Sequence, residues 1–314
     1  MAIKIVFLDS DSLGPGPDLG IFEKFGSFTA YPDTAPHQTI ERVGDAEIVI
    51  SNKVKIDRAV MDSCPKLQLI CIAATGMNNV DLPYAAEKGI QVKNVAGYAT
   101  ESVAQVTFAL LLSLLHHIAW FDHFVKSGNY SRWHSFTCYE RGFSEISGKQ
   151  FGILGMGAIG KRVALIAEAF GAKVVYCSTS GKNQYDRYPS LPLPALLATS
   201  DIVSVHSPLN RDTYGLIKAE QLRTMKKSAI LINTGRGKIV DEADLAEALN
   251  EGWIAGAALD VHAHEPIEAD NPLLSLKEPE RLIQTPHIAW AAIEARIRLT
   301  EQIARHIQTF LTGD

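Results

Sequence analysis

Short apolar runs alternate with amphipathic stretches along the whole chain. Continuous apolar runs bounded by polar or glycine-rich segments are typical of strands that are covered on both faces. In the first third we predict such strands at residues 3–8, 28–30, 48–50, 69–72 and 90–94. Further strands are predicted at residues 150–154, 173–177, 202–206, 229–233, 255–260 and 282–285. Helical stretches lie between most of these strands, so the pattern predicts an α/β protein built on parallel sheets.

A long apolar stretch separates the two series of strands. It predicts one buried helix from residue 100 to about residue 121. Polar side chains interrupt it at Gln105, Thr107, Ser113, His116 and His117. A membrane span would tolerate these poorly, so we expect the helix inside a large domain or at an interface. An aromatic-rich segment follows at residues 130–143, and a last helix is predicted at residues 291–311.

Residues 150–160, QFGILGMGAIG, combine a buried strand with a glycine-rich turn and the start of a helix. Gly155, Gly157 and Gly160 form the pattern G-x-G-x-x-G. The first glycine permits a tight turn, the second lets the backbone approach a pyrophosphate, and the third lets helix and strand pack closely. Unpaired N–H groups at the helix N-terminus stabilise the diphosphate. Because six predicted strands begin here, we interpret the motif as part of a doubly wound dinucleotide-binding domain.

The same residues fit most of a P-loop, the phosphate-binding loop of ATPases. Gly155, Gly160 and Lys161 match its pattern, but Arg162 stands where serine or threonine would hold Mg²⁺. The sequence therefore favours a dinucleotide over ATP.

Composition narrows the class of protein further. The 314 residues include 46% hydrophobic and 21% charged residues and carry a formal net charge of −5, as in a soluble globular protein of about two domains. No basic excess indicates nucleic acid or a membrane as a partner. The four cysteines form no C-x-x-C pair, and residues 1–10 predict a strand rather than a signal peptide. We therefore expect a cytoplasmic protein without a metal site.

Several motifs, in order, resemble those of the D-isomer-specific 2-hydroxyacid dehydrogenases, and the resemblance covers nearly the whole chain. The motifs are ATG at 74–76 with NNVD at 78–81, NVAGYATESVAQ at 94–105, the glycine motif, HSPL at 206–209, NTGRG at 233–237, DVHAHEP at 260–266 and TPHIAW at 285–290. The segments ATGMNNVD, NVAGYATESVAQ and ADNPLL look most like the glycerate dehydrogenase, or hydroxypyruvate reductase, branch.

This resemblance implies an α/β enzyme of two domains. A Rossmann doubly wound parallel sheet, residues 99–287, would be inserted into a flavodoxin-like substrate-binding domain formed by residues 1–98 and 288–314. Substrate and nicotinamide would meet in the cleft between the domains, with hinges near Tyr98 and Ile288. Members are usually homodimers that pair through the nucleotide domains, around the long helix and the aromatic segment.

Arg236, Glu265 and His287 supply the residue types that hydride transfer to a 2-keto acid requires. Arg236 offers a planar fork for carboxylate and carbonyl oxygens. His287 can give or take the proton, and Glu265 would orient its ring and raise its pKa. Glu265 could instead be a solvated loop charge. His262 and His264 compete for the role of acid, but neither falls on the family motif, and we interpret both as loop residues.

The resemblance also assigns binding residues. For the substrate they are Asn52, Val54, Thr75, Gly76, Arg236 and Trp290. Backbone N–H groups of Thr75 and Gly76 would bind the carboxylate, and Trp290 could equally be ordinary core packing. For the cofactor they are Thr107, Gly155, Gly157, Ala158, Ile159, Gly160, Ser178, Thr179, His206, Pro208, Thr213, Thr234, Arg236, Asp260 and His287. Asp260 would accept a hydrogen bond from the nicotinamide carboxamide.

The choice of cofactor depends on the end of the strand at 173–177. NAD-dependent members usually carry Asp or Glu there to bind the ribose hydroxyls, and here Ser178 takes that position. Hydroxyls at 178–180 and the charge of Lys182 could accept a 2′-phosphate, yet no arginine follows directly. The sequence favours NAD, while NADP and the use of both cofactors stay open.

These expectations describe an oxidoreductase that transfers a hydride between NAD(P)H and a small 2-keto acid. Hydroxypyruvate or glyoxylate reduction, or D-glycerate oxidation, is the first hypothesis. The nearest alternative is another 2-keto acid, such as pyruvate or a branched or aromatic analogue. A dinucleotide-sensing regulator on the same fold is an alternative from a different class. The set of Arg236, Glu265 and His287 favours catalysis over regulation.

Overall fold

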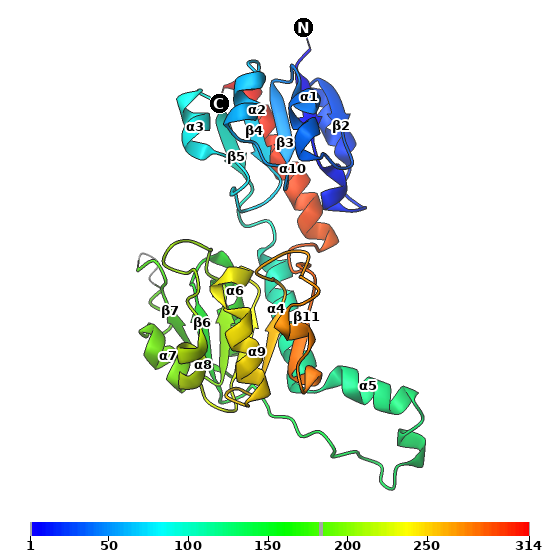
Figure 1. Ribbon diagram of the computed structural model, residues 1–314, viewed down its shortest axis with the longest axis vertical. Coiled ribbons are helices and arrows are strands. Elements are labelled where there is room, and N and C mark those ends of the chain that lie inside the picture. The colour runs from blue at the N-terminus through cyan, green and yellow to red at the C-terminus, as the bar shows by residue number, and fades with distance from the viewer. Residues whose placement is uncertain (1, 182–184, 314) are drawn as a thin grey trace. The chain divides into compact units, whose positions relative to one another are not determined.

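The computed structural model describes residues 2–181 and 185–313, and the chain divides into two compact units (Figure 1). The first unit consists of Met1–Ala99 and Trp290–Asp314, and the second of Thr100–Ala289. Lys182, which the sequence suggested as a partner of a 2′-phosphate, lies outside the described residues.

A parallel sheet of five strands forms the centre of the first unit, in the order β2-β1-β3-β4-β5. Its strands are β1 (Lys4–Phe7), β2 (Ser27–Ala30), β3 (Ile48–Ser51), β4 (Leu69–Ile72) and β5 (Gln91–Asn94). Its helices are α1 (Thr39–Val43), α2 (Arg58–Ser63), α3 (Leu82–Glu87), α10 (Ile293–Thr312) and the 3₁₀ helices η1 (Ser10–Leu13), η2 (Leu19–Phe25) and η3 (Pro36–Gln38). This strand order confirms the predicted flavodoxin-like topology.

Helices cover both faces of this sheet because every strand in its middle is apolar on both sides. On one face, α1, α2 and α3 bury residues such as Val43, Met61 and Ala85 against the strands. On the other face, α10 packs against β4 and η2. Arg296 of α10 donates hydrogen bonds of 2.6 Å to the carbonyl oxygens of Leu13 and Pro15, which ties the C-terminal helix to the first loop.

The second unit contains a parallel sheet of six strands in the order β11-β10-β9-β8-β6-β7. Its strands are β6 (Gln150–Leu154), β7 (Lys173–Cys177), β8 (Ile202–Val205), β9 (Ile230–Asn233), β10 (Gly256–Leu259) and β11 (Leu282–Gln284). Its helices are α4 (Thr100–Leu115), α5 (Ile118–Lys126), α6 (Ala158–Ala169), α7 (Leu193–Thr199), α8 (Ala219–Thr224), α9 (Glu242–Asn250) and the 3₁₀ helices η4 (Tyr130–Arg132), η5 (Gly237–Ile239), η6 (Pro272–Leu274) and η7 (Pro279–Arg281).

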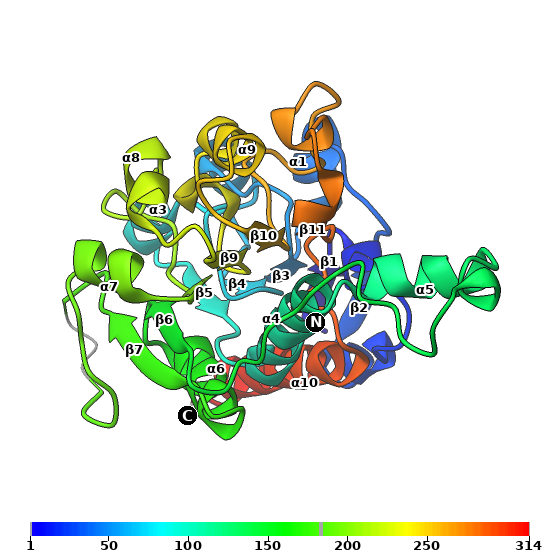
Figure 2. The same cartoon turned by 90° about the horizontal axis from the view of Figure 1, so that it is seen from below.

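Helices also cover this second sheet on both faces (Figure 2). One hydrophobic core joins α4 and α6 to the strands through residues such as Phe108, Phe151 and Val163. A second core joins α7, α8 and α9 to the opposite face through residues such as Leu154 and Leu249. The predicted doubly wound arrangement is therefore confirmed.

The strand order changes direction between β6 and β8. From β6 the chain continues to β7 at the edge of the sheet. Beyond β7, one isolated parallel β-bridge pairs Tyr176 with Ser190. The chain then returns to the other side of β6 and continues through β8 to β11. Ligands of doubly wound sheets bind where the order reverses, at the carboxyl ends of the strands. In this unit that place is formed by the turns that follow β6 and β8.

The predicted extent of the long apolar helix is wrong. α4 ends at Leu115, and α5 begins at Ile118 at an angle of 58° to it. His117 adopts a left-handed conformation with φ 53°, which interrupts the helical hydrogen bonds. Apolar residues resume at Ile118 directly after His116 and His117, so these two polar positions could not be told from the other polar positions within the stretch.

α5 and the chain that follows it extend away from the sheet of the second unit (Figure 1). Aromatic side chains on this extension are open to solvent: Phe136 is 86% exposed and Tyr139 is 81% exposed. Among the described residues, no single helix has the length and apolar character to cross a membrane, and only α4 and α5 taken together would pass such a test, across their bend.

Candidate active site

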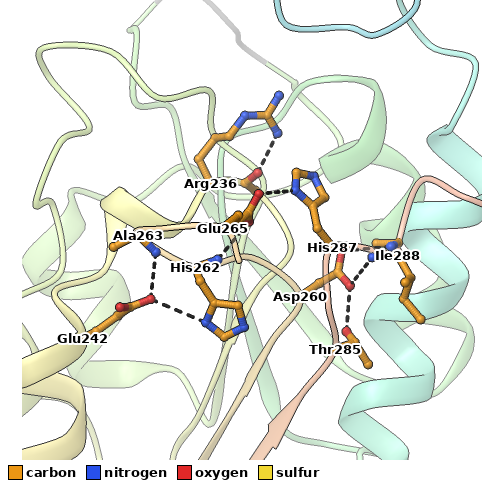
Figure 3. A network of polar contacts seen from close by, with 11 residues as sticks. Arg236, Glu242, Asp260, His262, Ala263, Glu265, Thr285, His287 and Ile288 are labelled. Carbon is orange, nitrogen blue, oxygen red and sulfur yellow. Dashed lines mark hydrogen bonds and ion pairs between the residues drawn. The ribbon is translucent and has the colours of Figure 1, made fainter. Parts of the chain in front are cut away.

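A histidine and a glutamate meet beyond the carboxyl ends of β10 and β11 (Figure 3). Nδ1 of His287 lies 2.7 Å from Oε2 of Glu265. Since the glutamate occupies Nδ1, Nε2 is the ring nitrogen that can reach a ligand, and it has no hydrogen-bond partner among the described residues. The pair can therefore exchange one proton at Nε2.

Asp260 holds the turn that carries His287. Its fully buried carboxylate accepts hydrogen bonds from the hydroxyl of Thr285 (2.6 Å) and the backbone N–H groups of Ile288 (2.9 Å) and Ala289 (2.8 Å). Its carbonyl oxygen accepts the N–H of His287 at 2.7 Å. Burial raises the pKa of Asp260, against the opposing effect of these hydrogen bonds. These contacts stabilise the left-handed conformation of His287, φ 54°, which is unfavourable for a side chain other than glycine.

Glu242 holds the loop that carries Glu265 through hydrogen bonds. Oε1 of Glu242 accepts the N–H of Ala263 at 2.8 Å, and Oε2 accepts the side-chain amide of Asn271 at 2.7 Å. Burial acts to raise the pKa of Glu242, but the facing imidazole of His262 and the hydrogen bonds from Ala263 and Asn271 outweigh it and hold that pKa below its usual range. The N–H of His262 in turn donates to Oε1 of Glu265 at 3.0 Å.

His262 and His264 both lie in this loop, and neither takes the place of the acid. The imidazole of His262 is nearly buried and faces Glu242 at 3.5 Å rather than His287 (Figure 3). The side chain of His264 is 62% exposed. Glu242 was missed from the sequence, although an acidic residue directly after the helix N-cap Asp241 is a signal that could have drawn attention to it.

Arg236 follows β9 in a tight turn. Its Nη1 donates to the carbonyl oxygen of Gly235 at 2.7 Å, and its own carbonyl accepts from the side chain of Asn233 at 3.0 Å. Gly237 packs so closely on the loop that an added Cβ would overlap the backbone of His262. This contact joins the arginine turn to the loop of Glu265, and Figure 3 shows Arg236, Glu265 and His287 grouped together.

The glycine turn after β6 has the geometry of a diphosphate site. Gly155 adopts φ 97°, and a Cβ there would lie 2.7 Å from Oγ of Ser207. A Cβ on Gly160 would overlap the carbonyl oxygen of Gly155, whereas Gly157 faces open space. The first helical hydrogen bond of α6 is donated by the N–H of Lys161, so the N–H groups before it, at Ala158 and Ile159, are left for an anion. These residues fit a dinucleotide.

The end of β7 borders a cavity of about 540 Å³. The hydroxyl oxygen of Ser178 is buried at its edge and has no hydrogen-bond partner among the described residues. Thr179 donates to the hydroxyl of Ser207 at 3.2 Å, which donates to the carbonyl of Leu154 at 3.0 Å. The unused hydroxyl of Ser178 is therefore the polar group of this strand end that a ribose could bind.

The turn after β8 contributes several of the other expected cofactor residues. Burial lowers the pKa of His206 to about 3, so the ring is neutral at physiological pH. Pro208 is exposed. Thr213 is fully buried, and its hydroxyl donates to the carbonyl of Pro208 at 2.6 Å and accepts from the N–H of Asn210 at 2.9 Å. Thr213 thus shapes the loop rather than presenting its hydroxyl at the surface.

The first unit holds the remaining expected residues. The side chains of Asn52 and Val54 are buried after β3. The carboxylate of Asp9 accepts hydrogen bonds from three backbone N–H groups of this loop. Oδ1 accepts from Asn52 at 2.9 Å, and Oδ2 accepts from Lys53 at 2.6 Å and Val54 at 3.2 Å. Asp9 was missed from the sequence, where a carboxylate just after a buried strand was the available signal. It sets the shape of the loop that was expected to choose the substrate.

Thr75 and Gly76 follow β4 in the same unit. The hydroxyl of Thr75 donates to the carbonyl of Val95 at 3.2 Å, but the backbone N–H groups of Thr75 and Gly76 have no acceptor among the described residues. Two adjacent unpaired N–H groups can bind an anion. Trp290 lies edge-on against Tyr98, with ring centroids 6.4 Å apart.

No group of three or more His, Cys, Asp or Glu side chains within residues 2–181 and 185–313 is arranged to hold a metal ion.

Comparison with known proteins identifies the family to which the chain belongs. The family model for the NAD binding domain of D-isomer specific 2-hydroxyacid dehydrogenases matches residues 108–289, which is more than half of the chain. The chain belongs to this family. The resemblance inferred from the motifs is therefore confirmed.

Two relatives align with nearly the whole of this chain. A hydroxypyruvate reductase of Blautia hydrogenotrophica is 39% identical over 99% of this chain and 98% of its own. A glycerate dehydrogenase of Methylorubrum extorquens is 38% identical over 100% of this chain and 98% of its own. Among solved structures, the NADPH-dependent glyoxylate/hydroxypyruvate reductase of Sinorhizobium meliloti, in complex with NADP and malonate, has a TM-score of 0.84 and 25% identity over 99% of this chain and 94% of that one.

Proposed function

We propose that this dehydrogenase reduces hydroxypyruvate or glyoxylate with NAD(P)H, or oxidises D-glycerate in the reverse direction. The observation that carries the proposal is the hydrogen bond of 2.7 Å between His287 and Glu265, in the same unit as Arg236 and the glycine turn. These groups are the proton donor, its partner and the cation that a 2-keto acid requires. The hydroxypyruvate reductase and glycerate dehydrogenase among the relatives support the choice of substrate.

Each of the three side chains has one task. When bound, the reduced nicotinamide supplies the hydride to the carbonyl carbon. The guanidinium of Arg236 binds the oxygens of the keto acid and stabilises the negative charge that develops. His287 donates the proton from Nε2 to the carbonyl oxygen. Glu265 holds the ring through Nδ1, so that Nε2 points at the substrate in every turnover.

The remaining contacts to the substrate are assigned to the first unit. We propose that residues 1–98 and 288–314 form the substrate-binding domain. The unpaired N–H groups of Thr75 and Gly76 bind the carboxylate, while Asn52, Val54 and Trp290 limit the size of the substrate side chain.

The dinucleotide is assigned to residues 99–287. Ala158 and Ile159 bind the diphosphate through their N–H groups. The buried, unpartnered hydroxyl of Ser178 binds the adenosine ribose, and Thr179 lies beside it. A serine recognises the ribose hydroxyls less strongly than a carboxylate would, and it does not repel a 2′-phosphate. We favour NAD, with NADP as the second candidate.

We also propose that the enzyme is a cytoplasmic homodimer. The exposed aromatic residues of the extension after α5, among them Phe136 and Tyr139, are typical of a surface that a second copy covers. The net charge of −5 gives no reason to expect nucleic acid or a membrane as a partner.

A steady-state panel tests the proposal directly. Hydroxypyruvate, glyoxylate, pyruvate and phenylpyruvate are each reduced with NADH and with NADPH, using the wild type and Arg236→Ala. We expect the highest kcat/KM with hydroxypyruvate or glyoxylate, and a large loss in the variant. A preference for pyruvate or phenylpyruvate would establish another 2-keto acid as the substrate. Tight dinucleotide binding without turnover of any keto acid would favour the regulator.

A further inference from the structure

Four polar side chains form a line of hydrogen bonds in the second unit. Oγ1 of Thr107 in α4 lies 3.2 Å from Oγ1 of Thr234, which follows β9. Oγ1 of Thr234 lies 3.3 Å from Nδ1 of His206, and Nε2 of His206 lies 2.8 Å from Oγ of Ser204 in β8. The hydroxyls of Thr107, Thr234 and Ser204 are buried with their residues. Each hydroxyl has one hydrogen to donate, which restricts how the line can be filled.

The end of the line at α4 determines its direction. Oγ1 of Thr107 lies 2.8 Å from the carbonyl oxygen of Val103, which can only accept, so the hydrogen of Thr107 is used there. Thr234 must then be the donor in its contact with Thr107. Its single hydrogen is consumed, and so Nδ1 of His206 must donate to Thr234.

The same reasoning continues to the other end. A neutral imidazole carries one hydrogen, and burial keeps His206 neutral at physiological pH. With Nδ1 protonated, Nε2 is an acceptor and the hydroxyl of Ser204 donates to it. In the opposite assignment, Nδ1 of His206 would accept the hydrogen of Thr234. The oxygens of Thr107 and Thr234 would then face each other with lone pairs and no hydrogen between them. Only one arrangement of hydrogens therefore fills every contact.

We propose that this line is directional, with His206 as the Nδ1–H tautomer, and that it makes Thr234 an acceptor, never a donor, toward the cofactor. The first part concerns the protein alone, and the second rests on the proposed function. Thr234 keeps one lone pair after accepting from His206. Thr107 and His206 are positioning residues in this scheme, because they act on the cofactor through Thr234.

As a consequence, the site prefers the amino group of the nicotinamide carboxamide over its carbonyl oxygen. Asp260 is also acceptor-only when ionised, and three hydrogen bonds from Thr285, Ile288 and Ala289 already occupy it. Both side chains expected beside the nicotinamide therefore offer only lone pairs. They bind the amino group of a carboxamide and give nothing to its carbonyl oxygen. The site should select a nicotinamide that carries an NH₂ group.

The tautomer is tested without cofactor or substrate. The cross-peak pattern between ring protons and ring nitrogens in a ¹H–¹⁵N NMR spectrum distinguishes the Nδ1–H from the Nε2–H form, and the signals of His206 are assigned by their loss in His206→Asn. We expect the Nδ1–H form in the wild type and in Thr107→Ser, which keeps the hydroxyl. In Thr107→Val the hydrogen of Thr234 is released, and the population should shift toward Nε2–H. An Nε2–H form in the wild type would overturn the proposal.

The preference is tested by binding, followed through protein fluorescence. The reduced 3-acetylpyridine analogue lacks the NH₂ group, whereas the thionicotinamide analogue retains it. We expect the acetylpyridine analogue to bind at least ~5-fold more weakly, the value of about one hydrogen bond. This gap should shrink in Thr107→Val and stay in Thr107→Ser. Equal affinities in the wild type would reject the acceptor role, and a protein that binds neither analogue would reject the proposed function while leaving the tautomer result intact.

Discussion

The ring of His287 is held by Glu265 across 2.7 Å, although 22 residues separate them in the chain. The contact depends on two different supports. Asp260 binds the turn of His287, and Glu242 binds the loop of Glu265. Two buried or part-buried carboxylates thus stabilise the two sides of the proton-transfer pair, which leaves Nε2 of the histidine in a constant orientation.

Loss of this pair should reduce turnover without loss of fold. His287→Ala is expected to lower kcat by ~10²–10⁴-fold, because the proton donor is removed. Glu265→Gln keeps an oxygen that can accept from Nδ1 but loses the negative charge, and should cause a smaller decrease. His264→Ala serves as the control, since this loop histidine is 62% exposed. Turnover of His287→Ala close to that of the wild type, measured with hydroxypyruvate, would exclude His287 as the donor.

Two glycines of the same motif should respond differently to alanine. A methyl group on Gly160 would overlap the carbonyl oxygen of Gly155, so Gly160→Ala should lower the free energy of unfolding by about 1–3 kcal/mol or more. Gly157 faces open space, and Gly157→Ala should leave stability within about 0.5 kcal/mol of the wild type. It should still weaken dinucleotide binding several-fold, because the methyl group enters the diphosphate site. Urea unfolding and cofactor titration measure the two effects, and equal stability losses would contradict this division of roles.

Ser178 should control the choice between NAD and NADP. Ser178→Asp places a carboxylate where the ribose hydroxyls are expected, which favours NAD and repels a 2′-phosphate. We expect the ratio of kcat/KM for NADH over NADPH to rise by at least ~10-fold. Ser178→Asn is the matched control, because asparagine has the size of aspartate but carries no charge. If both variants leave the ratio unchanged, Ser178 does not contact the ribose.

Stability should fall on acidification because of His206. Burial lowers its pKa from 6.5 to about 3 in the folded protein. Between these values the unfolded chain binds a proton that the folded protein does not, so the free energy of unfolding decreases as the pH falls through this window. Above it both states are neutral, and below it both are protonated. His206→Asn should flatten this part of the curve in urea unfolding measured from about pH 7 to about pH 4, whereas His264→Asn should not change it.

The order of strands and helices could be predicted from the sequence. Continuous apolar runs are required in parallel strands that are covered on both faces, and the chain contains such a run at nearly every observed strand. The glycine motif was equally readable, since the turn between β6 and α6 has no room for side chains at Gly155 and Gly160. The helix break at His117 could not be predicted, because the apolar helices α4 and α5 lie directly before and after the two histidines and other polar residues within α4 cause no break.

Sequence alone thus determined the two parallel sheets, the family and the residue types of the proposed active site. These depend on local patterns: apolar runs, turn glycines, and motifs that keep their spacing. Tertiary structure decided which partners these residues have. The order of strands in the sheet brings Asp260 to Thr285, Glu265 to His287, and Thr234 to His206. The packing of α4 on the sheet brings Thr107 to Thr234. A buried polar group needs a hydrogen-bond partner, and in these pairs folding supplies one that is 22 or more residues away in the chain.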